Sequence, residues 1–328
     1  TGGPAYYIRA AFKGRLGKVL AGIFSVLVIC ALGFMGNMVQ SNSIGAAFRN
    51  AFGIPPLVVG VLVAAAAGFV FLGGVQRIAS VTEKIVPVMA LFYIIGAFLI
   101  IAVNFRRIPD AFAHDFHRRF FPAGSRGRCN GHHRAKRQSA LAWRAAFFSN
   151  EAGMGSTPHA PCGSKGEESL RSGVVAMMGV FIDTFVILTL TALVVLVTGV
   201  LPRGYAGELQ GVDLTQAGFE TMFGRGGTVF IAVCMLFFAF STIIGWYFFG
   251  EVNIRSLFGK KGVKVYALLV CIFVAVGSTL KVDLVWSLSD TFNGLMVIPN
   301  LISLLSLSNT VSRLYQAYRR PKQIQEAS

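Results

Sequence analysis

The stretch from Phe147 to Pro158, Phe-Phe-Ser-Asn-Glu-Ala-Gly-Met-Gly-Ser-Thr-Pro, places a carboxylate and two glycines between segments that are otherwise apolar enough for a lipid bilayer. A charge at membrane depth is costly and is by default a sign of function. Glycines there weaken a helix, and the backbone groups that they free must be satisfied in a protein-lined cavity. Glu151, Gly153 and Gly155 therefore indicate a broken helix beside a small-ligand or ion site, as in secondary transporters. The alternative is an interfacial loop, and this stretch alone does not separate the two.

The composition predicts an all-α, polytopic helical membrane protein. Hydrophobic residues make up 54% of the chain and charged residues only 13%, whereas a soluble domain carries about a quarter charged residues. Several apolar runs approach the roughly 20 residues that cross a bilayer as a helix. These predicted spans are Leu16–Ala46, Pro56–Leu72, Ile85–Asn104, Gly173–Leu201, Thr228–Phe249, Val265–Leu280 and Val285–Leu307.

One stretch, residues 113–146, departs abruptly from this pattern. It holds eight of the 30 Lys and Arg residues and four of the five histidines. Taken literally, it would bind nucleic acid, anionic lipid or a metal. A metal-dependent membrane enzyme using the His-rich segment 114–133 is therefore one alternative, although no spacing there matches a helical zinc motif. The histidines concerned are His114, His117, His132 and His133.

Two arguments favour another explanation of this basic stretch. Cytoplasmic loops are enriched in Lys and Arg, and the later basic segments fall inside only if one more helix crosses between Asn104 and Gly173. If suitable codons are chosen for these residues and the reading frame is shifted by one or two bases, the translation can also give peptides that are plausible for a membrane protein. We therefore hypothesise that residues 113–146 and 161–172 are out-of-frame sequence. The net charge of +16 is then inflated, and we expect no nucleic-acid partner.

The segment Ser149-Asn-Glu-Ala-Gly-Met-Gly-Ser-Thr-Pro-His159 resembles the signature of the alanine or glycine:cation symporter family, the sodium:alanine symporters. Residues Gly2–Ile8, Gly36–Ile44 and Ile182–Gly199 are also similar to that family. The resemblance implies a leucine-transporter-like fold of about eleven spans built from inverted repeats. It also implies sodium- or proton-driven uptake of alanine or glycine across the bacterial inner membrane.

On this mapping, residues 1–328 form a single transmembrane transporter domain that begins just before the third span and is N-terminally truncated. The missing first span supplies much of the amino-acid and sodium coordination in the family. We expect sodium-coupled symport of alanine or glycine by a monomer in the lipid bilayer, with Na⁺ as coupling ion and no cofactor. For the polypeptide as given we predict no activity, as for the product of a decayed gene.

Polar residues on the predicted span Leu16–Ala46 are the first candidates for substrate binding. Asn37, Gln40 and Ser41 lie three or four positions apart and share one helical face. Amides inside a bilayer need partners, and a bound zwitterion would provide them. The alternative is hydrogen bonding between helices, which is common for such residues.

The predicted break provides a second set, Asn150, Gly153, Met154 and Gly155. A helix end exposes amide donors and carbonyl acceptors, so the substrate carboxylate or amine can dock on the opened backbone. The glycines would let it approach closely. We expect Glu151 to hold the break together or to pair with a cationic group, without contacting the substrate.

The span Thr228–Phe249 provides the last set. By resemblance we assign the hydroxyls of Ser241 and Thr242 to sodium, a hard cation that prefers oxygen ligands. Trp246 lies one turn beyond Thr242 and, with it, would close the pocket over a small side chain. The alternatives are hydroxyls bonded back to helix carbonyls and a tryptophan that anchors at the membrane interface. Asp183, followed by Thr184, lies in an apolar span and should have a partner.

Overall fold

A computed structural model describes residues 3–109, 113, 150–151, 153–159, 167–205 and 208–326. These residues form helices and short turns without any strand, so the predicted all-α class is confirmed for them. The basic His-rich stretch, the additional crossing helix and residues 160–166 lie outside the described residues, and the hypotheses about them stay predictions. Residues 167–172 of the second suspect segment begin helix α8 (Glu167–Ile182).

The first apolar run is one continuous helical rod of 38 residues, Arg15–Phe52. It consists of α2 (Arg15–Val28), the π-helix η1 (Ile29–Gly36) and α3 (Asn37–Phe52). Gly53 ends the rod with a left-handed φ of 71°, the usual helix C-terminus. The next helix, α4 (Pro56–Leu72), has the bounds that the sequence predicts and begins with proline.

The next helices also contain the predicted spans. Helix α5 (Gly74–Val103) is longer than the predicted Ile85–Asn104 and is followed by the 3-10 turn η2 (Phe105–Arg107). Helix α8, the π-helix η4 (Asp183–Leu188) and α9 (Thr189–Val197) together form a second long apolar segment, Arg171–Val197. Two short helices then follow, α10 (Leu201–Tyr205) and α11 (Val212–Phe223).

The two predicted spans Thr228–Phe249 and Val265–Leu280 belong to a single helical element, α12 (Arg225–Gly277). Gly259 has a non-helical φ of 71° and ψ of −170°, so α12 is two helices joined at a kink. The basic residues around it therefore lie on helix ends rather than on a loop. Helix α13 (Val282–Glu326) contains the predicted Val285–Leu307 and runs beyond it.

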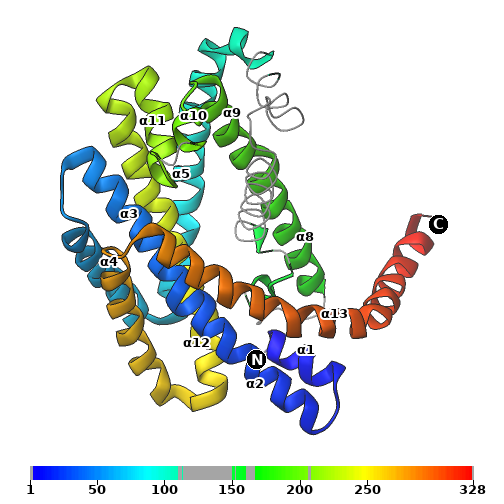
Figure 1. The fold of residues 1–328 in the computed structure, drawn as a ribbon. Coiled ribbons are helices and arrows are strands. Elements are labelled where there is room, and N and C mark those ends of the chain that lie inside the picture. Colours follow the sequence, from blue (N-terminus) through cyan, green and yellow to red (C-terminus); the bar gives the residue numbers. More distant parts are fainter. Residues whose placement is uncertain are drawn as a thin grey trace, which may run out of the picture.

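Several hydrophobic clusters hold the described helices together, and two of them border the regions discussed below (Figure 1). In one, α12 packs on α3 and α4, and Tyr247 stacks on Phe71 at 3.7 Å between ring centroids. In the other, the short helix α1 (Pro4–Ala11) packs with α2 and α13 around Phe24 and Met296. Figure 1 shows α13 crossing α3 and α2 toward α1, with its last turns beyond the bundle.

Among the described residues, four helical segments are long and apolar enough to cross a membrane, and α4 and the part of α5 from Pro87 to Val103 are shorter apolar helices. Large apolar side chains are exposed along α8, including Val175, Met177 and Phe181, and such a surface suits contact with lipid. A polytopic membrane protein is therefore the architecture of the described residues.

Candidate functional site

Glu151 and residues 153–156 have a non-helical backbone, which agrees with the predicted break. Three residues there have left-handed φ angles: Glu151 at 50°, Gly153 at 76° and Gly155 at 79°. Glycine adopts this conformation freely, but a glutamate rarely does, and such outliers gather at functional sites. The chain then tightens into the 3-10 turn η3 (Thr157–His159).

Trp246 of α12 holds the opened segment from one side. Its indole Nε1 donates a hydrogen bond to the Glu151 carboxylate at 2.5 Å, and the side chain is buried. Gly36 of the π-helix η1 packs against the indole ring, since a Cβ on Gly36 would lie only 2.6 Å from that ring. Trp246 therefore lies in the interior beside the break and is not an interfacial anchor.

The second π-helix, η4, approaches from another side. The Thr184 hydroxyl donates a hydrogen bond to the side-chain oxygen of Asn150. The Asp183 carboxylate is close enough to interact electrostatically with Glu151. Both π-helices thus border the break, in keeping with the frequent use of π-bulges at functional sites.

Asn300 of α13 holds the third side of the break. Its side-chain Nδ2 donates a hydrogen bond to the Gly153 carbonyl at 2.7 Å. A Cβ on Gly155 would lie 2.8 Å from the Asn300 oxygen, so close approach as well as φ requires glycine there. Met154 is buried with Phe24, so its side chain faces the core.

The signature histidine fixes the end of the segment. The buried His159 bonds through Nδ1 to the Ser156 carbonyl at 2.8 Å and through Nε2 to the Asn253 side chain, also at 2.8 Å. In the tautomer with the proton on Nδ1, that nitrogen donates to the Ser156 carbonyl, and Nε2 accepts from the Asn253 amide. Sequence reasoning did not identify Asn253 or Asn300 as site residues. Their signal is an amide side chain on a membrane helix, which requires a partner that the sequence does not identify.

The three residues predicted on α3 have different surroundings. Asn37 is fully buried and donates to the Gly33 carbonyl at 3.0 Å, while its Oδ1 accepts no hydrogen bond from the described residues. The Ser41 hydroxyl donates to the Val274 carbonyl of α12 at 2.6 Å, which is the helix–helix alternative. Gln40 is half-buried. Their roles in substrate binding stay predictions.

The two predicted sodium ligands lie one turn before Trp246 on α12. The hydroxyls of Ser241 and Thr242 both donate to the Phe238 carbonyl at 2.9 Å. This is the back-bonding alternative, but a hydroxyl that donates keeps lone pairs for a cation. The sodium assignment therefore stays a prediction.

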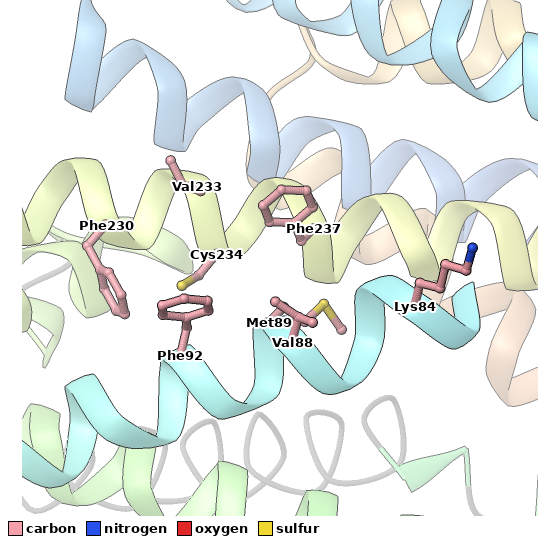
Figure 2. Close-up of a pocket in the computed structure, with 8 residues that line it drawn as sticks. All are labelled: Lys84, Val88, Met89, Phe92, Phe230, Val233, Cys234 and Phe237. Carbon is pink, nitrogen blue, oxygen red and sulfur yellow. The ribbon is translucent and has the colours of Figure 1, made fainter. Parts of the chain in front are cut away.

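An apolar cavity of about 460 Å³ lies between α5 and α12, away from the break (Figure 2). Figure 2 shows Phe92 of α5 opposite Cys234 and Phe230 of α12, with Lys84 at one end. The cavity is almost wholly apolar and offers no acidic partner for an ammonium group, so it does not suit a free amino acid. Its lining residues are Lys84, Val88, Met89, Phe92, Phe230, Val233, Cys234 and Phe237.

Comparisons with known proteins agree with the signature. The relatives include the sodium/alanine symporter AgcS of Methanococcus maripaludis, which is 37% identical over 95% of this chain and 68% of its own length. The probable sodium/glutamine symporter GlnT of Bacillus subtilis is 38% identical over 98% of this chain and 65% of its own. A sodium/proton-dependent alanine carrier protein of Bacillus sp. strain PS3 is 33% identical over 91% and 70%.

The chain thus spans about two thirds of the length of these curated relatives. The model of the sodium:alanine symporter family matches residues 1–328. Its members are transporters, so the metal-dependent enzyme alternative is wrong. The chain belongs to the sodium:alanine symporter family.

Proposed function

We propose that this protein binds a small neutral amino acid, alanine or glycine, at the opened segment 150–155 for sodium-coupled symport. The observation that carries the proposal is the hydrogen bond from Trp246 to Glu151 across backbone that has left the helix. A polar side chain that is held in place beside a broken helix is typical of the binding sites of secondary transporters. The names of the relatives, sodium/alanine symporter and alanine carrier, support the ligand and the ion.

The surroundings suit both ends of a zwitterion. Asp183, which interacts with Glu151, would offer carboxyl oxygens as acceptors for the substrate ammonium group. The substrate carboxylate would dock on backbone amides of the opened segment. Trp246, which packs against Gly36, would close the site over a small side chain.

For the coupling ion we propose Ser241 and Thr242 as sodium ligands. Both are one turn from Trp246 on α12, so an ion there would lie next to the amino-acid site. Each hydroxyl keeps acceptor capacity while it donates to Phe238. Sodium would then order the face of α12 that carries Trp246, which makes amino-acid binding depend on the ion.

Our proposals for the fold, the location and the oligomeric state follow from family membership. We propose a leucine-transporter-like inverted-repeat fold, a multi-pass location in the bacterial inner membrane, and a monomeric transporter domain. Ligand binding tests the proposed site more directly than transport does.

The experiment is equilibrium binding of radiolabelled alanine to the chain in lipid nanodiscs, with sodium or potassium as the only monovalent cation. We expect binding that requires sodium and that unlabelled glycine displaces. The Ser241→Ala, Thr242→Ala double variant should lower the apparent sodium affinity. Thr198→Ala is the matched control, since that hydroxyl bonds back to the Val194 carbonyl in the same way. Alanine binding that is equal in sodium and potassium would refute the proposal.

A further inference from the structure

Asn300 joins two parts of the chain that are far apart in sequence. Its Nδ2 donates to the Gly153 carbonyl at 2.7 Å, and its Oδ1 accepts a hydrogen bond from the Tyr7 hydroxyl of α1. Both ends of one amide are thus occupied, one by the opened segment and the other by a helix at the start of the described chain. Asn300 is 1% exposed, so neither bond has competition from bulk water.

The two hydrogen bonds depend on each other because of where they lie. The amide is next to an apolar cluster that includes Phe24, Met154 and Met296. A buried polar atom left unpaired there is costly, and paired bonds in a low dielectric strengthen one another. Without the Tyr7 hydroxyl, the Oδ1 atom of Asn300 would be buried without a donor, and the amide would be held less firmly against Gly153.

Helix α1 is built to hold Tyr7 in place. Ala5 and Ile8 are buried against α2 and α13, while the neighbouring Tyr6 is 41% exposed. Only one face of the helix therefore enters the core, and Tyr7 is at its edge. The stretch Gly2–Ile8, which resembles the family sequence, otherwise has no part in the proposed site.

We propose that Tyr7 and Asn300 form a relay through which α1 fixes the shape of the opened segment 150–155. Asn300 is then a positioning residue of the ligand site, and Tyr7 acts through it. The relay itself follows from the contacts, and only its effect on alanine binding rests on the proposed function.

The test is hydrogen–deuterium exchange of the amides in residues 153–159, with the full chain in lipid nanodiscs. Tyr7→Phe removes only the hydroxyl and should speed their exchange by about fivefold, as expected for loss of one net hydrogen bond. Tyr6→Phe is the matched control, because that ring is next in sequence and faces outward. It should leave exchange unchanged. Equal exchange in the two variants would overturn the relay.

A double-mutant cycle tests whether Tyr7 acts through Asn300. Asn300→Leu should speed exchange at least as much as Tyr7→Phe, and the double variant should be no faster than Asn300→Leu alone. Additive effects would show that Tyr7 acts by another route and would overturn the relay. Because Tyr7→Phe is nearly isosteric, its result remains decisive if Asn300→Leu fails to fold.

Alanine binding then separates the relay from the proposed function. If the parent chain binds alanine, Tyr7→Phe should weaken that binding several-fold and Tyr6→Phe should not. Faster exchange with unchanged affinity would overturn the positioning role of Asn300. If the parent binds no alanine in sodium, the proposed function fails, while the exchange data still decide whether the relay exists.

Discussion

Replacing Trp246 with phenylalanine removes the donor that holds Glu151 and keeps most of the ring. The Nε1-to-carboxylate distance is 2.5 Å, and the indole is buried against Gly36, so water cannot easily replace the lost donor. Leaving a buried acceptor without its donor costs about 1–3 kcal/mol. If the ligand site needs Glu151 in this position, alanine affinity should fall about tenfold to a hundredfold.

Radiolabelled alanine binding in nanodiscs, at saturating sodium, measures this change directly. Trp286→Phe on α13 is the matched control, because that ring packs with Met38 and Val39 in a different cluster. Thermal unfolding of both variants shows whether the fold is intact. A Trp246→Phe chain that is as stable as the control and binds alanine within threefold of the parent would refute the reasoning.

Three further predictions concern the same region. Gly155→Ala should lower the thermal unfolding midpoint more than Gly14→Ala. Both glycines have a φ of 79°, but only a Cβ on Gly155 would meet an amide oxygen, at 2.8 Å. Equal shifts of the midpoint in the two variants would contradict this. Asn253→Leu leaves Nε2 of the signature histidine unpaired and should cost about 1–3 kcal/mol of unfolding free energy in denaturant titration. Asn37→Leu should weaken alanine binding. Ser41→Ala should lower stability and leave the alanine affinity unchanged, since Ser41 pairs with a helix carbonyl. The reverse pattern would show that Ser41, and not Asn37, contributes to binding.

Hydropathy was enough to place the membrane helices, because a bilayer demands about 20 apolar residues wherever a helix crosses. The predicted Pro56–Leu72 has the bounds of α4, and the other predicted spans lie largely within described helical segments. Hydropathy did not show that α12 continues through its basic middle with only Gly259 outside the helical region. Charged residues suggest a loop, but they also occur on the water-exposed ends of two helices that are joined at one glycine.

The π-helices were not predicted, for a different reason. A π-bulge changes the hydrogen-bond register by one residue, and neither Ile29–Gly36 nor Asp183–Leu188 departs from an ordinary apolar helical composition. The Asn-Glu-Ala-Gly-Met-Gly signature, in contrast, indicated a break, because a carboxylate followed by two glycines is unusual at membrane depth, although an interfacial loop was an equal alternative. The partners of the break come from α12, η4 and α13, and no local pattern carries contacts of such long sequence separation.

Buried amides show why the site was only partly predictable and where its ligand belongs. A bilayer forces almost every polar atom on a helix to find a partner. Asn300 pairs with Gly153 of the opened segment, and Asn253 pairs with His159 just after it. Asn42 similarly donates to two carbonyls at the end of α12 and the turn beyond. Asn37 and Asn293 differ, since the buried Oδ1 of each accepts no hydrogen bond from the described residues. Of these two, Asn37 is next to Gly36, which touches Trp246, and we propose its Oδ1 as an acceptor for the ammonium group of a bound amino acid.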